Sequence, residues 1–312
     1  MLYDLNIAWS PTTSPDELLR TLRFSASLGY DVVALNHTIS PPIPPQISNP
    51  IPEFPSSPSS PPLPTILRRA TLLFSDPTQQ HRIPQLASTY DLLALRPQTE
   101  KAFQAACLNI QEASLISLDL SARLPFYFRP KPCMAAVHRG VRFEICYAAV
   151  LSPAADARAR ATFIGNVAQL VRATRGRGLV LSSEARGVLG LRAPADVVNL
   201  VHVWGVPRER AVEGLGAAAR GVVVNEGMRR TGFRGVIDVV GVAGRGGEGR
   251  RKRKNGGEDG ENEGGAGANS IVTAAGVEGE QQQPPLSKRQ AKKLKAALRK
   301  KHVSGDDEQK QA

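Results

Sequence analysis

Residues 2–35 read LYDLNIAWSPTTSPDELLRTLRFSASLGYDVVAL, which places an apolar extended segment, a helix and a second apolar segment in succession. We expect a strand over Leu2–Trp9, a helix over Ser14–Leu28 and a strand over Asp31–Leu35. Pro15 suits the first position of that helix, where the missing N–H has no partner to lose. Strands that are apolar almost throughout are buried on both faces, which is typical of parallel strands joined by helices.

The same alternation continues along the chain. Further strands are expected over Thr65–Phe74, Tyr90–Leu95, Ser114–Leu120, Arg142–Ala148 and Leu179–Ser182, with a last short strand at Val222–Val224. Helices are expected over Thr99–Leu108, Lys131–Arg139, Asp156–Thr174, Pro194–Val203 and Pro207–Ala219. Seven or eight strands fit either a barrel or an open doubly wound sheet. The strand count favours an α/β fold of the TIM-barrel-like (β/α) class, and no G-x-G-x-x-G follows the first strand.

Composition divides the chain into three regions. Residues 1–242 carry the strand and helix signals of the barrel domain. Within them, residues 41–64 hold 11 prolines among 24 residues, which predicts a polyproline-like or disordered insertion. Residues 243–312 are rich in Gly, Glu and Lys/Arg and lack the apolar side chains of a core, so we expect a disordered basic tail. Within the tail, 288–301 could form a basic helix.

The charge balance points to an anionic partner. Forty Lys and Arg against 28 Asp and Glu give a net charge of +12, and a surplus of this size is most often found in proteins that bind nucleic acid. A generic basic surface is the plainer explanation. Three cysteines without C-x-x-C spacing indicate buried thiols. Neither a membrane span nor a secretory signal is evident.

The first strand lacks the ligands of a metal enzyme. Asp4, Asn6 and Ala8 alternate, so we expect them on one side of the strand. In a metal phosphoesterase that side would carry an Asp-x-His-x-His array, but here an amide and a methyl group stand in place of the histidines. The strand predicts no metal site and no catalytic residue.

Five segments stand in an order that resembles one known family: Leu35–His37, Phe128–Lys131, His138–Tyr147, Leu181–Ala185 and Leu191–Leu200. Together they are similar to the thirty-kilodalton protein subunit of ribonuclease P and ribonuclease MRP, most closely to its fungal members. The resemblance covers residues 1–240 apart from the insertion. It implies a barrel related to polymerase-and-histidinol-phosphatase type phosphoesterases, in a particle whose RNA is the catalyst. The chain would then be a component of an endoribonuclease, itself non-catalytic and without a cofactor.

Basic residues are the candidates for RNA contact, because Lys and Arg bind phosphates while aromatic faces stack on unpaired bases. The aromatic residues Phe126–Phe128 lie among them, although a place in the core explains these rings equally well. A second cluster, Arg172, Arg175 and Arg177, ends a helix, where the dipole favours cations in any protein. The candidates are Arg123, Arg129, Lys131, His138, Arg139, Arg142, Arg186 and Arg192.

The basic tail suggests where in the cell the protein acts. A compact basic run fits a nuclear localisation signal, which predicts the nucleus and, with the family resemblance, the nucleolus. The expected partners are the ribonuclease P or MRP RNA, precursor tRNA and other protein subunits, in tRNA and rRNA processing. The run consists of Arg250, Arg251, Lys252, Arg253 and Lys254.

Two alternatives stay open. One is a metal-dependent phosphoesterase with a rebuilt site that uses Asp4, Asn36 and His37, with Glu144 or Asp119. The other is an assembly scaffold that contacts only proteins.

Overall fold

The computed structural model describes residues 1–52, 63–152 and 154–231. The expected tail, the basic run Arg250–Lys254, the helix at 288–301 and the second part of the proline-rich insertion lie outside the described residues. The strands are β1 (Tyr3–Ala8), β2 (Val32–Ile39), β3 (Thr65–Phe74), β4 (Leu92–Pro97), β5 (Leu115–Ser117), β6 (Arg142–Cys146) and β7 (Leu179–Ser182). The helices are α1 (Pro15–Ser27), α2 (Ile83–Thr89), α3 (Glu100–Leu108), α4 (Pro130–His138), α5 (Ala148–Leu151), α6 (Ala157–Thr174), α7 (Pro194–Val203), α8 (Arg208–Leu215) and α9 (Ala217–Thr231), with short 3₁₀ turns η1 (Pro77–Arg82) and η2 (Val188–Gly190).

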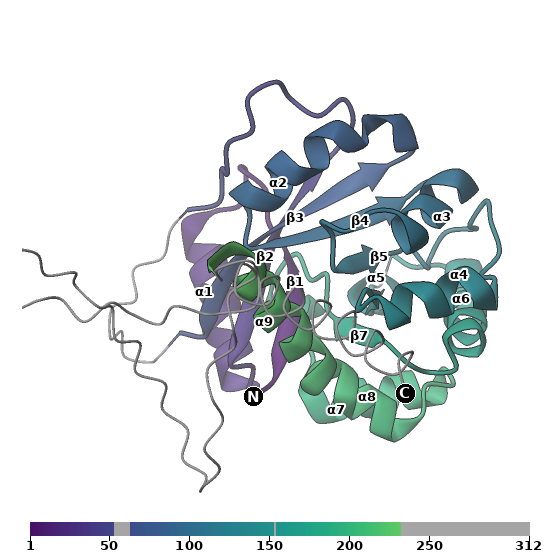
Figure 1. Ribbon diagram of the computed structural model, residues 1–312. Helices are drawn as coiled ribbons and strands as arrows, with labels where there is room; N and C mark the ends of the chain where they lie inside the picture. The colour runs from purple at the N-terminus through teal and green to yellow at the C-terminus, as the bar shows by residue number, and fades with distance from the viewer. Residues whose placement is uncertain (53–62, 153, 232–312) are drawn as a thin grey trace, which may run out of the picture. The chain divides into compact units, whose positions relative to one another are not determined.

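The seven strands form one sheet in the order β1 to β7, and every neighbouring pair is parallel. Figure 1 shows the strands in the middle, with α1 on one side and α3, α4 and α6 on the other. A doubly wound sheet would have a reversal in this order. The expected TIM-barrel-like α/β fold is therefore confirmed, as a nearly closed barrel.

The barrel closes where the chain leaves β7 and meets β1. The amide of Ala8 donates to the carbonyl of Ala185 over 2.9 Å, and the amide of Glu184 donates to Asn6 O over 2.7 Å. The Asp4 carboxylate adds a side-chain bond across the same seam, because it accepts from the Ser183 amide over 3.0 Å.

This seam corrects the expectation that Asp4, Asn6 and Ala8 share one side. The register of β1 shifts between Asp4 and Ile7. Leu5 belongs to the cluster inside the barrel, and the Asn6 amide also reaches inward to Glu144. Asp4 precedes the shift in register, and neighbouring residues of a strand point to opposite sides. Since Leu5 points into the barrel, Asp4 points away from it.

Helix α9 fills the barrel at the amino ends of the strands. Ala218, Ala219 and Val222 pack against inward-facing residues of the strands, including Leu5 and Ala94. The expected strand at Val222–Val224 is therefore wrong: three β-branched residues favour a strand by propensity, but burial of one helix face inside the barrel outweighs that preference. Glu226 of the same helix is buried and accepts from Ser114 Oγ.

Part of the proline-rich insertion belongs to the fold. Ile43 and Ile51 are buried in the cluster between the sheet and the outer helices, and Arg82 donates to the carbonyl of Ile43 over 3.0 Å. Residues 41–52 form neither helix nor strand, and their two isoleucines supply the apolar surface that is buried.

We predict that Ala219→Leu destabilises the protein by about 1–3 kcal/mol, because the inner end of the barrel has no space for three extra carbon atoms. The free energy of unfolding is measured by urea titration. Ala217→Leu, on the exposed side of the same helix, is the matched control and should change it by less than about 0.5 kcal/mol. Equal effects of the two substitutions would show that α9 does not fill the barrel.

Candidate functional site

The carboxyl ends of the strands are where barrels of this class carry their chemistry. Here the interior is occupied by an ion pair. Arg69 of β3 and Glu144 of β6 are both fully buried, and the guanidinium donates to the two carboxylate oxygens over 2.5 and 2.7 Å. Burial alone would raise the pKa of Glu144, but the Arg69 charge lowers it to about 2. Both groups are therefore ionised at neutral pH.

Arg69 also donates to two other groups. Its Nη1 donates to Leu5 O over 2.6 Å and its Nε to Thr71 Oγ1 over 3.3 Å. Thr71 in turn donates to Asn36 Oδ1 over 2.7 Å. Asn6, at a position where a phosphoesterase would hold a metal ligand, instead donates to Glu144 Oε2 over 3.3 Å. One hydrogen-bonded network thus joins β1, β2, β3 and β6.

A second arginine lies nearer the mouth. Arg96 donates to Glu184 Oε1 over 2.6 Å and to Ser117 Oγ over 3.2 Å. Cys146 is buried next to Asn6, with its sulfur 3.4 Å from the Asn6 amide nitrogen, and burial raises the pKa of its thiol. The three cysteines are free and buried, as expected.

These residues do not fit a divalent cation. The central carboxylate, Glu144, already has an arginine on both of its oxygens, and a metal ion would stand beside a second guanidinium. The residues of the phosphoesterase alternative do not converge either. Asn36 is engaged by Thr71, His37 by Tyr90, and Asp119 by Ser121 on the surface. No group of three metal-binding side chains is found within residues 1–52, 63–152 and 154–231.

Asp4 is a fully buried carboxylate without an ion pair to a described residue. Burial raises its pKa to about 6, against the lowering effect of bonds from Ser183 and Asn6. Its Oδ2 has no hydrogen-bond partner among the described atoms. Asp4 therefore helps to close the barrel through its hydrogen bond from Ser183. Its ionised form destabilises the folded state, because burial disfavours the charge.

The expected RNA-binding residues fall at two ends of the barrel. Arg123, Arg129 and Lys131 lie on the loop between β5 and α4 and at the start of α4, at the mouth, and are exposed. Arg186 follows β7 at the same end and is also exposed. Arg129 lies 3.3 Å from Glu100, and both side chains are largely solvated. The mouth therefore carries a rim of accessible cations.

The neighbouring aromatic residues separate into core and surface. Phe126 is buried and stacks on Phe103 with ring centroids 4.7 Å apart, and Phe128 packs partly against the same core. Tyr127 is 77 % exposed. It is the ring of this segment that is accessible to a base, and three consecutive aromatic residues gave no sequence signal that would single it out.

The other expected residues lie elsewhere or hold the fold. At the opposite end, His138 is the last residue of α4, Arg139 follows it and Arg142 begins β6. Arg139 donates to the carbonyl of Cys107 in α3 over 2.6 Å and to that of Ile110, just beyond α3. Arg192 donates to Leu189 O and Leu191 O within its own loop. Arg139 and Arg192 are therefore committed to backbone carbonyls.

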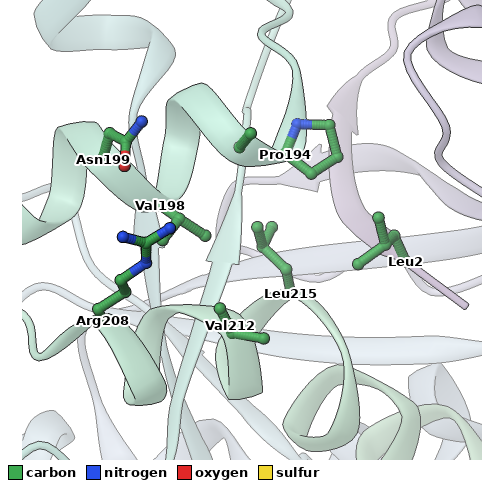
Figure 2. Close-up of a pocket in the computed structure, with 8 residues that line it drawn as sticks. Leu2, Pro194, Val198, Asn199, Arg208, Val212 and Leu215 are labelled. Atoms are coloured by element: carbon green, nitrogen blue, oxygen red, sulfur yellow. The ribbon is translucent and has the colours of Figure 1, made fainter.

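Two cavities lie away from the ion pair. One, of about 470 Å³, is lined by His37, Tyr90 and the first part of the insertion; burial lowers the pKa of His37, whose Nδ1 lies 3.1 Å from Tyr90 Oη. The other, of about 280 Å³, lies between α7 and α8 beside Leu2. Figure 2 shows its apolar lining, with Arg208 toward Asn199 at one end. Neither cavity gathers a catalytic set.

Fold and interior together define a class: a nearly closed (β/α) barrel whose centre is held by an arginine–glutamate pair. The model of the family described as RNase P subunit p30 matches residues 1–231. The chain belongs to this family, and it is a protein subunit of ribonuclease P.

The chain is similar to curated relatives over most of their length. The chain is 32% identical over 241 residues to the probable ribonuclease P protein subunit 3 of Schizosaccharomyces pombe, covering 76% of this chain and 99% of the relative. It is 29% identical to the ribonuclease P/MRP protein subunit RPP1 of Saccharomyces cerevisiae, covering 79% and 87%. It is 32% identical to the mouse ribonuclease P protein subunit p30, covering 69% and 82%.

Solved structures support the fold. A chain in the cryo-EM structure of archaeal ribonuclease P with mature tRNA has a TM-score of 0.55 at 12% identity, covering 77% of this chain and 99% of that one. The expected family and barrel are therefore confirmed. No helix within the described ranges is long and apolar enough to cross a membrane.

We predict that Arg69→Met destabilises the protein by about 3–5 kcal/mol, because it leaves the Glu144 carboxylate buried without a partner. The double variant R69M/E144M should recover most of this loss, since it removes both charges at similar volume. Chemical unfolding of the two variants measures the difference. Equal stability of the single and double variants would disprove the interior ion pair.

The pKa of Asp4 gives a stability that depends on pH. A carboxyl whose pKa rises from 3.8 to about 6 on folding favours the folded state while it is protonated, and this advantage is lost as pH rises through 6. Asp4→Asn stays neutral and keeps an oxygen for the Ser183 amide. We expect it to stabilise the protein by up to about 3 kcal/mol at pH 8 and by much less at pH 4.5. Melting curves at both pH values test this, and a pH-independent difference would contradict it.

Proposed function

We propose that this chain is a non-catalytic RNA-binding and assembly subunit of ribonuclease P and of MRP. In this role it supports the removal of 5′ leaders from precursor tRNA and the processing of rRNA. Its partners are the ribonuclease P or MRP RNA, precursor tRNA and neighbouring protein subunits.

The observation that carries the proposal is the contrast between the interior and the surface. The interior charges are neutralised by Arg69–Glu144 and Arg96–Glu184, while exposed cations lie around the mouth. Phosphate chemistry at the centre has neither a metal ligand set nor a free base in the described residues. The exposed cations are suited to phosphate contact, which supplies most of the affinity for nucleic acid.

At the mouth we propose that Arg123, Arg129, Lys131 and Arg186 contact RNA phosphates, with Tyr127 stacking on an unpaired base. An exposed ring beside cations fits single-stranded nucleotides better than a duplex, whose bases are already stacked. We retain His138 and Arg142 as contacts at the opposite end. Arg139 and Arg192 act on RNA only by holding the loops that carry these contacts.

Membership in a family of eukaryotic ribonuclease P subunits implies work in a nuclear RNA-processing complex. Within the nucleus we propose the nucleolus, because of the link to rRNA processing. Arg250–Lys254 supply the nuclear localisation signal in this proposal, and residues 243–312 act as a basic tail appended to the 1–242 barrel domain.

The test is recovery of the tagged full chain from its cells after ultraviolet crosslinking, with sequencing of the bound RNA. We expect strong enrichment of the ribonuclease P and MRP RNAs. The variant Y127A/R129A should lower the crosslinking yield severalfold, whereas the matched control F24A/R23A on α1, also exposed, should not. Absence of enrichment in the unmodified chain, with other subunits still recovered, would favour a scaffold that contacts only proteins.

A further inference from the structure

Three turns meet at the end of the barrel opposite the mouth. They are 138–142 between α4 and β6, 172–178 between α6 and β7, and 205–210 between α7 and α8. A Cβ built on Gly178 would lie 2.8 Å from Val137 at the end of α4, so the second turn is pressed against the first. A Cβ on Gly176 would lie 3.6 Å from Arg210, so the third turn also lies next to the second.

These turns are strongly basic. Arg172, Arg175 and Arg177 are exposed, and none of their guanidinium groups has a hydrogen bond or ion pair to a described residue. His138 and Arg208 are exposed beside them. The acids of the three segments and the first part of α8 are Glu209 and Glu213, and Glu213 is paired with Arg210 over 2.6 Å.

In the described residues, the other side of this end carries acids beside its cations. Across the barrel, the turns that precede β2 and β4 carry Asp31 and Asp91, which pair with the N-terminal amine and with Arg68 and Arg230. A solvated surface of evenly mixed charge would not show this division. The asymmetry therefore marks a face suited to an extended anion.

The backbone of Arg175 is an independent observation. It ends α6 with φ 54°, in the left-handed region, where glycine or asparagine is the usual residue. Gly176 and Gly178 also have positive φ and supply the freedom that the turn needs. An arginine side chain kept at a strained position, pointing to no described partner, is consistent with a use outside the chain.

We infer that Arg172, Arg175 and Arg177, with His138, Arg142 and Arg208, bind the phosphate backbone of a double-stranded segment of RNA. The inference rests on the proposed function and adds a second surface to it. Exposed tyrosine, tryptophan and phenylalanine are absent from these three described turns, since Trp204 is buried. Cations without stacking rings read the backbone and shape of a helix, not unpaired bases.

The test measures binding of the full chain to its own ribonuclease P RNA and to a 20-base-pair RNA duplex, as a function of salt. We expect R172Q/R177Q to weaken duplex binding about tenfold at 0.1 M salt and to make the slope of log K against log salt shallower by about 1.5–2. R20Q/R23Q on α1 removes the same charge from another exposed surface and is the matched control. Equal slopes for the two double variants would overturn the inference.

Arg175→Gly separates binding from folding. It should raise or preserve the melting temperature, because it relieves the left-handed strain, and weaken RNA binding about threefold. A lower melting temperature with unchanged RNA affinity would show a structural role and overturn the site.

The outcomes distinguish this site from the proposed function. If the unmodified chain is not enriched on ribonuclease P and MRP RNAs in cells, the proposed function fails. If that enrichment holds and R172Q/R177Q keeps its RNA affinity, only this surface fails. Loss of another protein subunit from R172Q/R177Q, with RNA affinity kept, would identify a protein interface and overturn the RNA assignment.

Discussion

The fully buried pair Arg69–Glu144 sets the constraint on which this barrel depends. A guanidinium taken out of water is costly unless all its donors are bonded, and removing either partner leaves an uncompensated charge. Here the donors reach β1 through Leu5 and the carboxylate on β6, so one residue of β3 links strands on different sides of the barrel. Such a pair need not stabilise more than apolar packing would. It specifies one arrangement of the interior, and it uses the space and the carboxylate that a cation would need. The function that we propose therefore uses the outer surfaces of the barrel.

The elements with strong local signals were predictable from sequence. Thr65–Phe74 and Pro194–Val203 have the expected bounds, because an apolar run and a proline at the first helical turn each act locally. The error at Val222–Val224 has a tertiary cause: nothing in three valines reveals that the barrel end will bury one helix face. The role of Arg69 was hidden for a similar reason. Its neighbour Arg68 is also basic, and only the register of the sheet decides which of the two faces inward.

For the candidate RNA-binding residues, separation in the sequence does not indicate distance in the structure. Arg129 and His138 are nine residues apart, yet helix α4 holds them about 13 Å apart along its axis and at different ends of the barrel. Conversely, His138 and Arg177 are distant in sequence and close in space, since the α6–β7 turn packs on Val137. In the sequence, Arg172–Arg177 looked like ordinary cations at a helix end. The left-handed Arg175 and the lack of described partners make that explanation insufficient.

A rigid barrel gives these two basic surfaces a fixed separation. Helix α4 separates Arg129 at the mouth from His138 at the opposite end by about 13 Å along its axis, which exceeds the screening length of about 8 Å at physiological salt. In the proposed role, the mouth and the opposite end would therefore each contact its own stretch of anion. The mouth offers Tyr127 beside its cations, whereas the opposite end offers arginines alone. In the proposed role, one chain can then hold an unpaired segment and a helix of the same folded RNA in a set geometry. That proposed task depends on the rigidity of the closed barrel, to which the interior ion pair and helix α9 contribute.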